Sequence, residues 1–134
     1  MGPLKDQPIL LSFNPPRLFQ IHAEVNEFVT QGGVTPLPLP LDDPLLKAAI
    51  NPVDGLLYLT GFNIWGTKAK GKTFLGRVHT NPKSTWTTPT HVQVAKRGIF
   101  LRFATPLDPK SASHRKSYEV RRWNYKRTSN YGSP

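Results

Sequence analysis

Short runs of alternating apolar and polar residues make up most of the chain, and proline or glycine interrupts them at close intervals. Alternation over a few residues is typical of a half-buried strand, because successive side chains point to opposite faces of a sheet. No long segment repeats its apolar residues at helical spacing. The pattern therefore predicts a mainly β protein built from short strands and turns.

The first quarter of the chain predicts two strands and the start of a third. Ile9–Phe13 ends at Asn14-Pro15-Pro16, which we expect to be a turn because proline cannot donate a hydrogen bond to a sheet. Arg17–Val25 predicts the second strand, and Glu27–Thr30 predicts the start of the third.

A break and an extended segment are expected next. The two glycines of Gln31-Gly32-Gly33 predict the break. Val34–Leu41 alternates proline with leucine or valine, so it predicts an extended segment and at most an edge strand.

Two hairpins stand out in the middle of the chain. Ala48–Gly61 predicts strand, turn and strand, with Asp54-Gly55 supplying the positive φ of a tight turn. Phe74–Thr80 predicts the following strand. Residues 91–104 predict a second hairpin that turns at Lys96-Arg97-Gly98. Its alternating apolar positions are Val92, Val94, Ile99, Leu101 and Phe103.

A short helical turn and one more strand are expected near the C-terminus. Asp108 is a good N-cap, and the proline that follows it suits the first helical position. Tyr118–Tyr125 predicts a returning strand. Three strands after residue 90 are fewer than the seven or so of a β-sandwich, so we expect two units, residues 1–83 and an unfinished unit over residues 84–134.

Composition excludes several kinds of site. The chain of 134 residues has no cysteine, which excludes disulfides, cysteine-ligated zinc or iron–sulfur centres, covalent c-type haem and cysteine nucleophiles. Its apolar stretches are shorter than the roughly 20 residues of a membrane-spanning helix. The N-terminal residues show no export signal, so the sequence as written predicts a cytoplasmic location.

Charge is divided unevenly along the chain. The net charge is +10. Residues 1–66 have three basic and six acidic side chains, whereas residues 67–134 have fifteen basic side chains against Asp108 and Glu119 alone. A strongly basic half suggests an anionic partner such as nucleic acid, although charge alone does not indicate a fold.

Ordered motifs run from residue 31 to the C-terminus. Gln31–Leu39 (QGGVTPLPL), Asn51–Thr67 (NPVDGLLYLTGFNIWGT) and Leu75–Val78 (LGRV) come first. Together they resemble the last propeller blade, with the strand before it, of large bacterial sorbosone- or glucose-dehydrogenase-like proteins. The segments that are similar to the Ig-like domain following that blade are Gly98–Ala112, Tyr118–Val120, Arg122–Tyr125 and Asn130–Pro134.

This resemblance implies a β-propeller blade followed by an incomplete Ig-like β-sandwich. It also implies a periplasmic or secreted parent protein with a quinone, calcium or haem cofactor on regions that this chain lacks. The residues Val78–Asn81 (VHTN) differ from those that the family has at the corresponding position. We assign no catalytic, cofactor or metal residue in this chain, and whether the parent is an active enzyme stays open.

Candidate chemical groups are few. The histidines (His22, His79, His91 and His114) lack the spacing of metal ligands. Adjacent Asp42 and Asp43 in a proline-rich loop predict a solvated turn rather than an acid–base pair. Gly66–Thr73 matches the phosphate-binding pattern G-x-x-x-x-G-K-T, but the residues after it predict a strand where a phosphate loop needs a helix.

Two functions from different classes follow. We expect a non-catalytic fragment of a secreted dehydrogenase-like propeller, which contacts the remaining blades of its parent or associates with itself. The alternative is a small basic β-rich module that binds nucleic acid by stacking and charge. The residues that would do so are Arg121, Arg122, Trp123, Tyr125, Lys126 and Arg127.

Overall fold

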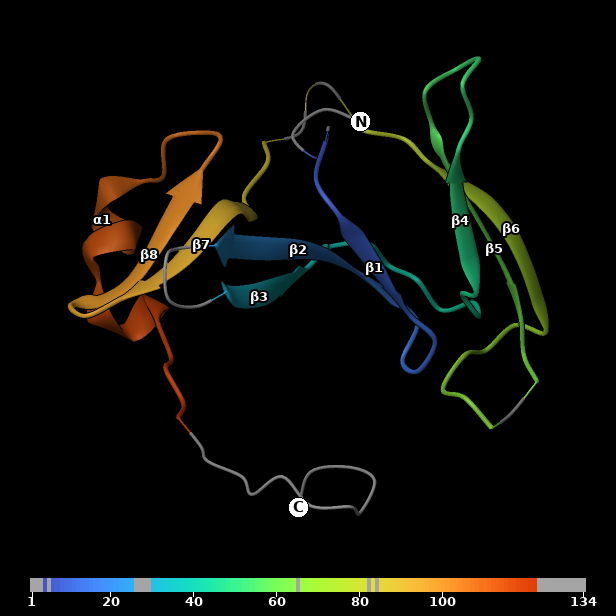
Figure 1. Cartoon of the computed structure of the whole chain (residues 1–134), viewed down its shortest axis with the longest axis horizontal. Helices are drawn as coiled ribbons and strands as arrows, with labels where there is room; N and C mark the ends of the chain where they lie inside the picture. The colour runs from blue at the N-terminus through green and yellow to red at the C-terminus, as the bar shows by residue number, and fades with distance from the viewer. Residues whose placement is uncertain are drawn as a thin grey trace.

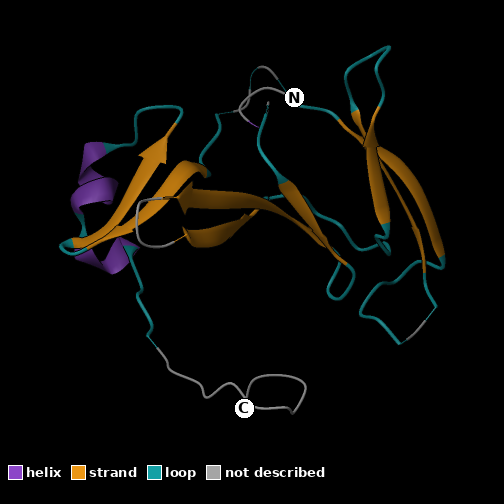
Figure 2. Ribbon diagram, viewed as in Figure 1, coloured by secondary structure: helices purple, strands orange, loops and turns teal. Residues whose placement is uncertain are grey.

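The computed structural model describes residue 4 and residues 6–25, 30–64, 66–81, 83 and 85–122. Over these residues the protein is mainly β, which confirms the predicted class. Strands form three small antiparallel sheets, and a short helix follows the last strand (Figure 1). Figure 2 shows how strands predominate over helix along the chain.

Sheet A contains β1 (Ile9–Ser12), β2 (Arg17–Val25) and β3 (Thr30–Pro36), with β2 in the centre. The turn predicted at Asn14–Pro16 joins β1 to β2, and the Asn14–Pro15 peptide bond is cis.

The predicted break at Gln31–Gly33 is wrong, because all three residues belong to β3. They pair with Glu24, Ala23 and His22 of the long central strand, whose backbone holds the glycines in an extended conformation. Thr30 begins β3, while residues 27–29 lie outside the described residues. Pro36 ends this edge strand, so residues 37–41 are not part of it.

Sheet B contains β4 (Lys47–Ile50), β5 (Leu57–Phe62) and β6 (Thr73–Val78), with β5 in the centre. The predicted hairpin between β4 and β5 is confirmed. Gly55 has a φ of 67°, and the Leu56 N–H donates to Asp54 Oδ1 over 2.9 Å. The aspartate side chain and the glycine backbone therefore shape the turn together.

The third sheet is the hairpin of β7 (Pro89–Ala95) and β8 (Gly98–Phe103), as predicted. Helix α1 (Pro109–Ser113) follows, with Asp108 as its N-cap, and the 3-10 helix η2 (Arg115–Ser117) comes next. The Asp108 side chain accepts a hydrogen bond from the Ser111 N–H over 2.9 Å. This confirms the predicted helical turn.

The predicted strand Tyr118–Tyr125 is wrong over its first five residues, Tyr118–Arg122, which pair with no strand. Local bonds hold Tyr118 instead: its hydroxyl donates to the Ala112 carbonyl oxygen over 2.6 Å, and its N–H donates to the Arg115 carbonyl oxygen. Its backbone therefore closes a helical turn. Residues 123–125 lie outside the described residues.

One hydrophobic cluster joins sheets A and B. It consists of buried leucines from both sheets and from the segments beside them, and Trp86 packs against it from the segment before β7. The buried members are Leu4, Leu18, Leu37, Leu45, Leu57 and Leu59.

Candidate functional site

The inner face of β2 carries a row of polar side chains toward β7. Because side chains alternate along a strand, Gln20, His22 and Glu24 share one face. Gln20 Nε2 donates to the Thr90 carbonyl oxygen over 3.3 Å, and Gln93 Nε2 donates to Glu24 Oε1 over 2.7 Å. Polar contacts therefore hold the β7–β8 hairpin against sheet A.

His22 lies within this polar row. It is only 5% exposed, and its Nε2 lies 2.9 Å from Thr35 Oγ1. Burial lowers the pKa of His22 below its usual value of 6.5, and the nearby His91 lowers it further. The fold therefore brings together two histidines far apart in the sequence, which histidine spacing did not predict. The sequence feature that could have indicated this polar row is the alternation Gln20-x-His22-x-Glu24, which puts the three polar side chains on one face of the strand.

The other two histidines lie elsewhere. His79 follows β6, and His114 caps η2, where its Nδ1 accepts a hydrogen bond from the Lys116 N–H over 3.3 Å. Within the described ranges, no three histidine, aspartate or glutamate side chains gather in a way that could hold a metal ion.

The opposite, outer face of sheet A is apolar. Leu10 pairs with Phe19 across β1 and β2, and Ile21 pairs with Val34 across β2 and β3. Val25 ends the row and is 77% exposed. Of the described residues that form this face, Arg17 alone is charged. The inner face of sheet A therefore carries both Leu18 of the hydrophobic cluster and the polar row of Gln20, His22 and Glu24, while the apolar outer face is open to solvent.

The β7–β8 hairpin also exposes apolar side chains. Val92 pairs with Leu101, and Val94 pairs with Ile99, so these four share one face. Sequence alternation predicted that such a face would be half buried. Val94, Ile99 and Leu101 are instead exposed, because no described strand packs against them.

The phosphate-binding pattern at Gly66–Thr73 forms an ordinary loop between antiparallel strands β5 and β6. Lys70 Nζ lies 2.7 Å from Asp42 Oδ2, and this hydrogen bond and charge raise the lysine pKa. The Asp43 side chain occupies the space where Gly71 would carry a Cβ. A carboxylate pair packed against the loop disfavours phosphate, so the geometry agrees with a structural loop.

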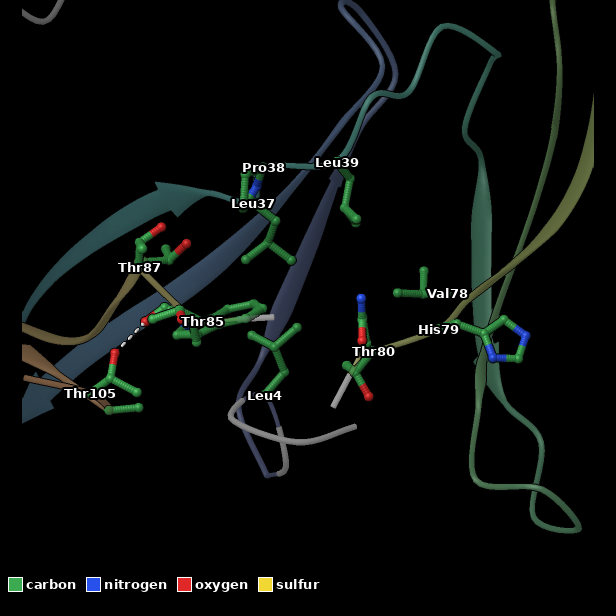
Figure 3. A pocket seen from close by; sticks show the side chains of 14 residues that line it. Leu4, Leu37, Pro38, Leu39, Val78, His79, Thr80, Thr85, Thr87 and Thr105 are labelled. Carbon is green, nitrogen blue, oxygen red and sulfur yellow. Dashed lines mark hydrogen bonds between the residues drawn. The ribbon is translucent and has the colours of Figure 1, made fainter. Parts of the chain in front are cut away.

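A cavity of about 530 Å³ lies beside the hydrophobic cluster (Figure 3). Leu4, Leu37 and Leu39 give it an apolar wall, and several threonines give it hydroxyl groups. Thr105 Oγ1 donates to the Trp86 carbonyl oxygen over 3.0 Å, while the Trp86 Nε1 is buried without a hydrogen-bond partner. The titratable side chain in the described lining is His79, so the cavity offers no acid–base pair.

The residues proposed for the alternative, nucleic-acid function are described only in part. Arg121 Nη2 lies 2.6 Å from Glu119 Oε1 in an exposed ion pair, and Arg122 is exposed. The remaining members lie outside the described residues. They are Trp123, Tyr125, Lys126 and Arg127.

Comparisons with protein-family models, with curated proteins and with solved structures found no match to this chain. Over the described residues, no helix is long and apolar enough to cross a membrane. The functional interpretation therefore depends on the geometry itself.

Proposed function

We propose that this chain is a non-catalytic structural unit of a larger, secreted, dehydrogenase-like β-propeller protein. Strands β4–β6 belong to the last propeller blade in this proposal, and β7–β8 open an Ig-like domain. The observation that carries the proposal is the open apolar outer face of sheet A. The largest apolar patch on a typical monomer measures about 300–600 Å² and is often functional, so such a face favours a partner surface.

The size of this face favours a partner within the same polypeptide. Three strands about 4.8 Å apart and a central strand of nine residues at about 3.3 Å each give roughly 14 by 30 Å, or about 400 Å². A stable dimer buries about 800 Å² on each partner. The face alone is too small for that, whereas a tethered neighbour acts at a high effective concentration.

The chemistry of the described residues supports a structural role. The buried titratable group, His22, faces another histidine and a threonine hydroxyl. The cavity beside Trp86 has an apolar wall and no pair of titratable groups in its described lining. Any quinone, calcium or haem of the parent therefore binds elsewhere in this proposal. The nucleic-acid alternative at Arg121–Arg127 stays a prediction.

The proposal is tested by adding one charge to the outer face. We expect the wild-type chain to bind the dye 8-anilinonaphthalene-1-sulfonate and to associate weakly, because the apolar face is open. Val34→Lys places a cation on this face beside Ile21 of the central strand, at a position where Val34 is 54% exposed. It should reduce both dye binding and the concentration dependence of the sedimentation coefficient.

Val53→Lys is the matched control. It makes the same chemical change in the β4–β5 turn, where Val53 is 92% exposed and belongs to no sheet face. This variant should behave as the wild type does. A wild-type chain that is monomeric at all concentrations, binds no dye and melts in one sharp cooperative transition would contradict the proposal.

A further inference from the structure

The outer face of sheet B differs in chemistry from that of sheet A. Strand alternation puts Tyr58 and Phe62 on this face of central strand β5. Lys47 lies on the same face of β4, and Arg77 lies on the same face of β6. The outer face of sheet B therefore combines aromatic rings on the middle strand with a cation on each flanking strand.

The register sets how these side chains neighbour one another. Tyr58 pairs with Arg77, and Thr60 pairs with both Lys47 and Leu75. Phe62 is 50% exposed and Leu75 is 79% exposed, so their apolar surfaces face solvent. Figure 1 shows β5 between β4 and β6 at one end of the molecule, away from the β7–β8 hairpin.

The basic loop after β5 turns away from this surface, because the Lys68 N–H donates to Asn14 Oδ1 over 3.0 Å and Gly71 packs against Asp43. Lys70 is occupied by its ion pair with Asp42. Lys68 and Lys72 on either side of it are exposed, and the ion pairs found among the described residues do not involve them. The cations that the strand register places on the outer face itself are Lys47 and Arg77.

This face is less suited to packing against a second sheet than the apolar outer face of sheet A, because burying the charges of Lys47 and Arg77 away from water is costly. An anionic partner that also offers flat rings fits both features. Single-stranded nucleic acids bind to exposed aromatic side chains on sheets and to flanking cations.

We propose that the outer face of sheet B binds single-stranded nucleic acid. Phe62 and Tyr58 stack on bases, and Lys47 and Arg77 contact phosphates. This surface is distinct from the C-terminal residues Arg121–Arg127, and it requires that no neighbouring propeller blade packs on the outer face of sheet B.

One carboxylate opposes binding at the edge of the surface. The Tyr58 hydroxyl donates to Asp54 Oδ2 over 2.8 Å. The Leu56 N–H first, and then Tyr58 and Arg77, lower the pKa of Asp54, so it is ionised at neutral pH. Its negative charge repels a phosphate near Arg77. Removing that charge should therefore strengthen binding of the nucleic acid. A substitution that only disturbs the fold would weaken binding instead.

The test measures fluorescence anisotropy of labelled oligothymidylate and oligouridylate with the full chain. Phe62→Ala should weaken binding by about fivefold to 150-fold, as expected for the loss of one stacked base. Phe100→Ala is the matched control, since Phe100 is an equally exposed phenylalanine in the basic hairpin. It should leave affinity unchanged.

Charge variants test the phosphate contacts. Arg77→Gln should weaken binding and reduce the slope of log affinity against log salt by about 0.7, the value for one phosphate on a single strand. Asp54→Asn keeps the Oδ1 acceptor of the turn and should strengthen binding several-fold. Circular dichroism establishes that each variant remains folded before its affinity is compared.

Several results would overturn the proposal. These are a Phe62→Ala affinity equal to wild type in the folded variant, an equal loss in Phe100→Ala, or an Asp54→Asn variant with no gain. Loss of binding in Arg121→Gln and Arg122→Gln but not in Arg77→Gln would place the site at the C-terminal residues instead.

Discussion

Replacing Gly61 with alanine is the sharpest test of how β5 is packed. Gly61 is buried on the inner face of β5. A Cβ at this position would overlap the Pro44 carbonyl oxygen, and would lie 2.7 Å from the Pro44 carbonyl carbon and 3.0 Å from Leu45 Cα. These atoms are backbone, so no side-chain rotation can relieve the overlap. We expect Gly61→Ala to destabilise the fold.

The size of the effect follows from how firmly the facing segment is held. Leu45 is buried in the hydrophobic cluster, and the Leu46 N–H donates to the Thr60 carbonyl oxygen over 2.9 Å. Overpacking in a core costs about 1–3 kcal/mol. The lower chain entropy of alanine offsets about 0.4–1 kcal/mol. The expected net loss in unfolding free energy is therefore about 1–2 kcal/mol.

Urea unfolding followed by circular dichroism measures this loss, and two other strand glycines serve as controls. A Cβ on Gly33 would meet no atom within 4 Å, so Gly33→Ala should match or exceed wild-type stability. A Cβ on Gly76 would meet the far end of the Phe74 ring, which can turn, so the loss should be smaller. A Gly61→Ala variant as stable as wild type would refute the reasoning.

Two further predictions concern His22 and the α1 cap. Because the folded-state pKa of His22 lies below 6.5, its stabilising contribution is complete above that pH and is lost as the pH falls below it. Urea melts at several pH values should show His22→Gln losing less stability on acidification than wild type, and an identical pH dependence would contradict the buried, neutral histidine. Asp108→Ala removes the acceptor of the Ser111 N–H, so that amide should exchange faster with solvent, while Asp108→Asn should retain protection.

Local sequence rules correctly predicted those elements that are determined by interactions between residues only a few positions apart. Asp54-Gly55 predicted the turn of the first hairpin, because only a few residue types suit a positive φ. Asp108 followed by proline predicted a helix start, since both residues complement its unpaired N–H groups. These interactions connect neighbours in the chain, so the rest of the fold does not alter them.

Longer-range pairing decided where the local signals failed. Gly32 and Gly33 read as a break, yet pairing with the nine-residue β2 holds them in a strand. Tyr118 read as the start of a strand, yet hydrogen bonds to Ala112 and Arg115 keep it beside α1. In both places the deciding partner is a backbone group that local sequence patterns cannot identify.

The sequence by itself determined the mainly β class, the two hairpins, the helix cap and the absence of cysteine chemistry. Only the tertiary structure decided which face of each sheet is covered. It placed the polar row of His22 against β7, left the apolar face of sheet A open, and put aromatic and basic side chains together on sheet B. Alternation tells which residues share a face, but which face is buried depends on how the sheets pack, and those contacts join residues far apart in the chain.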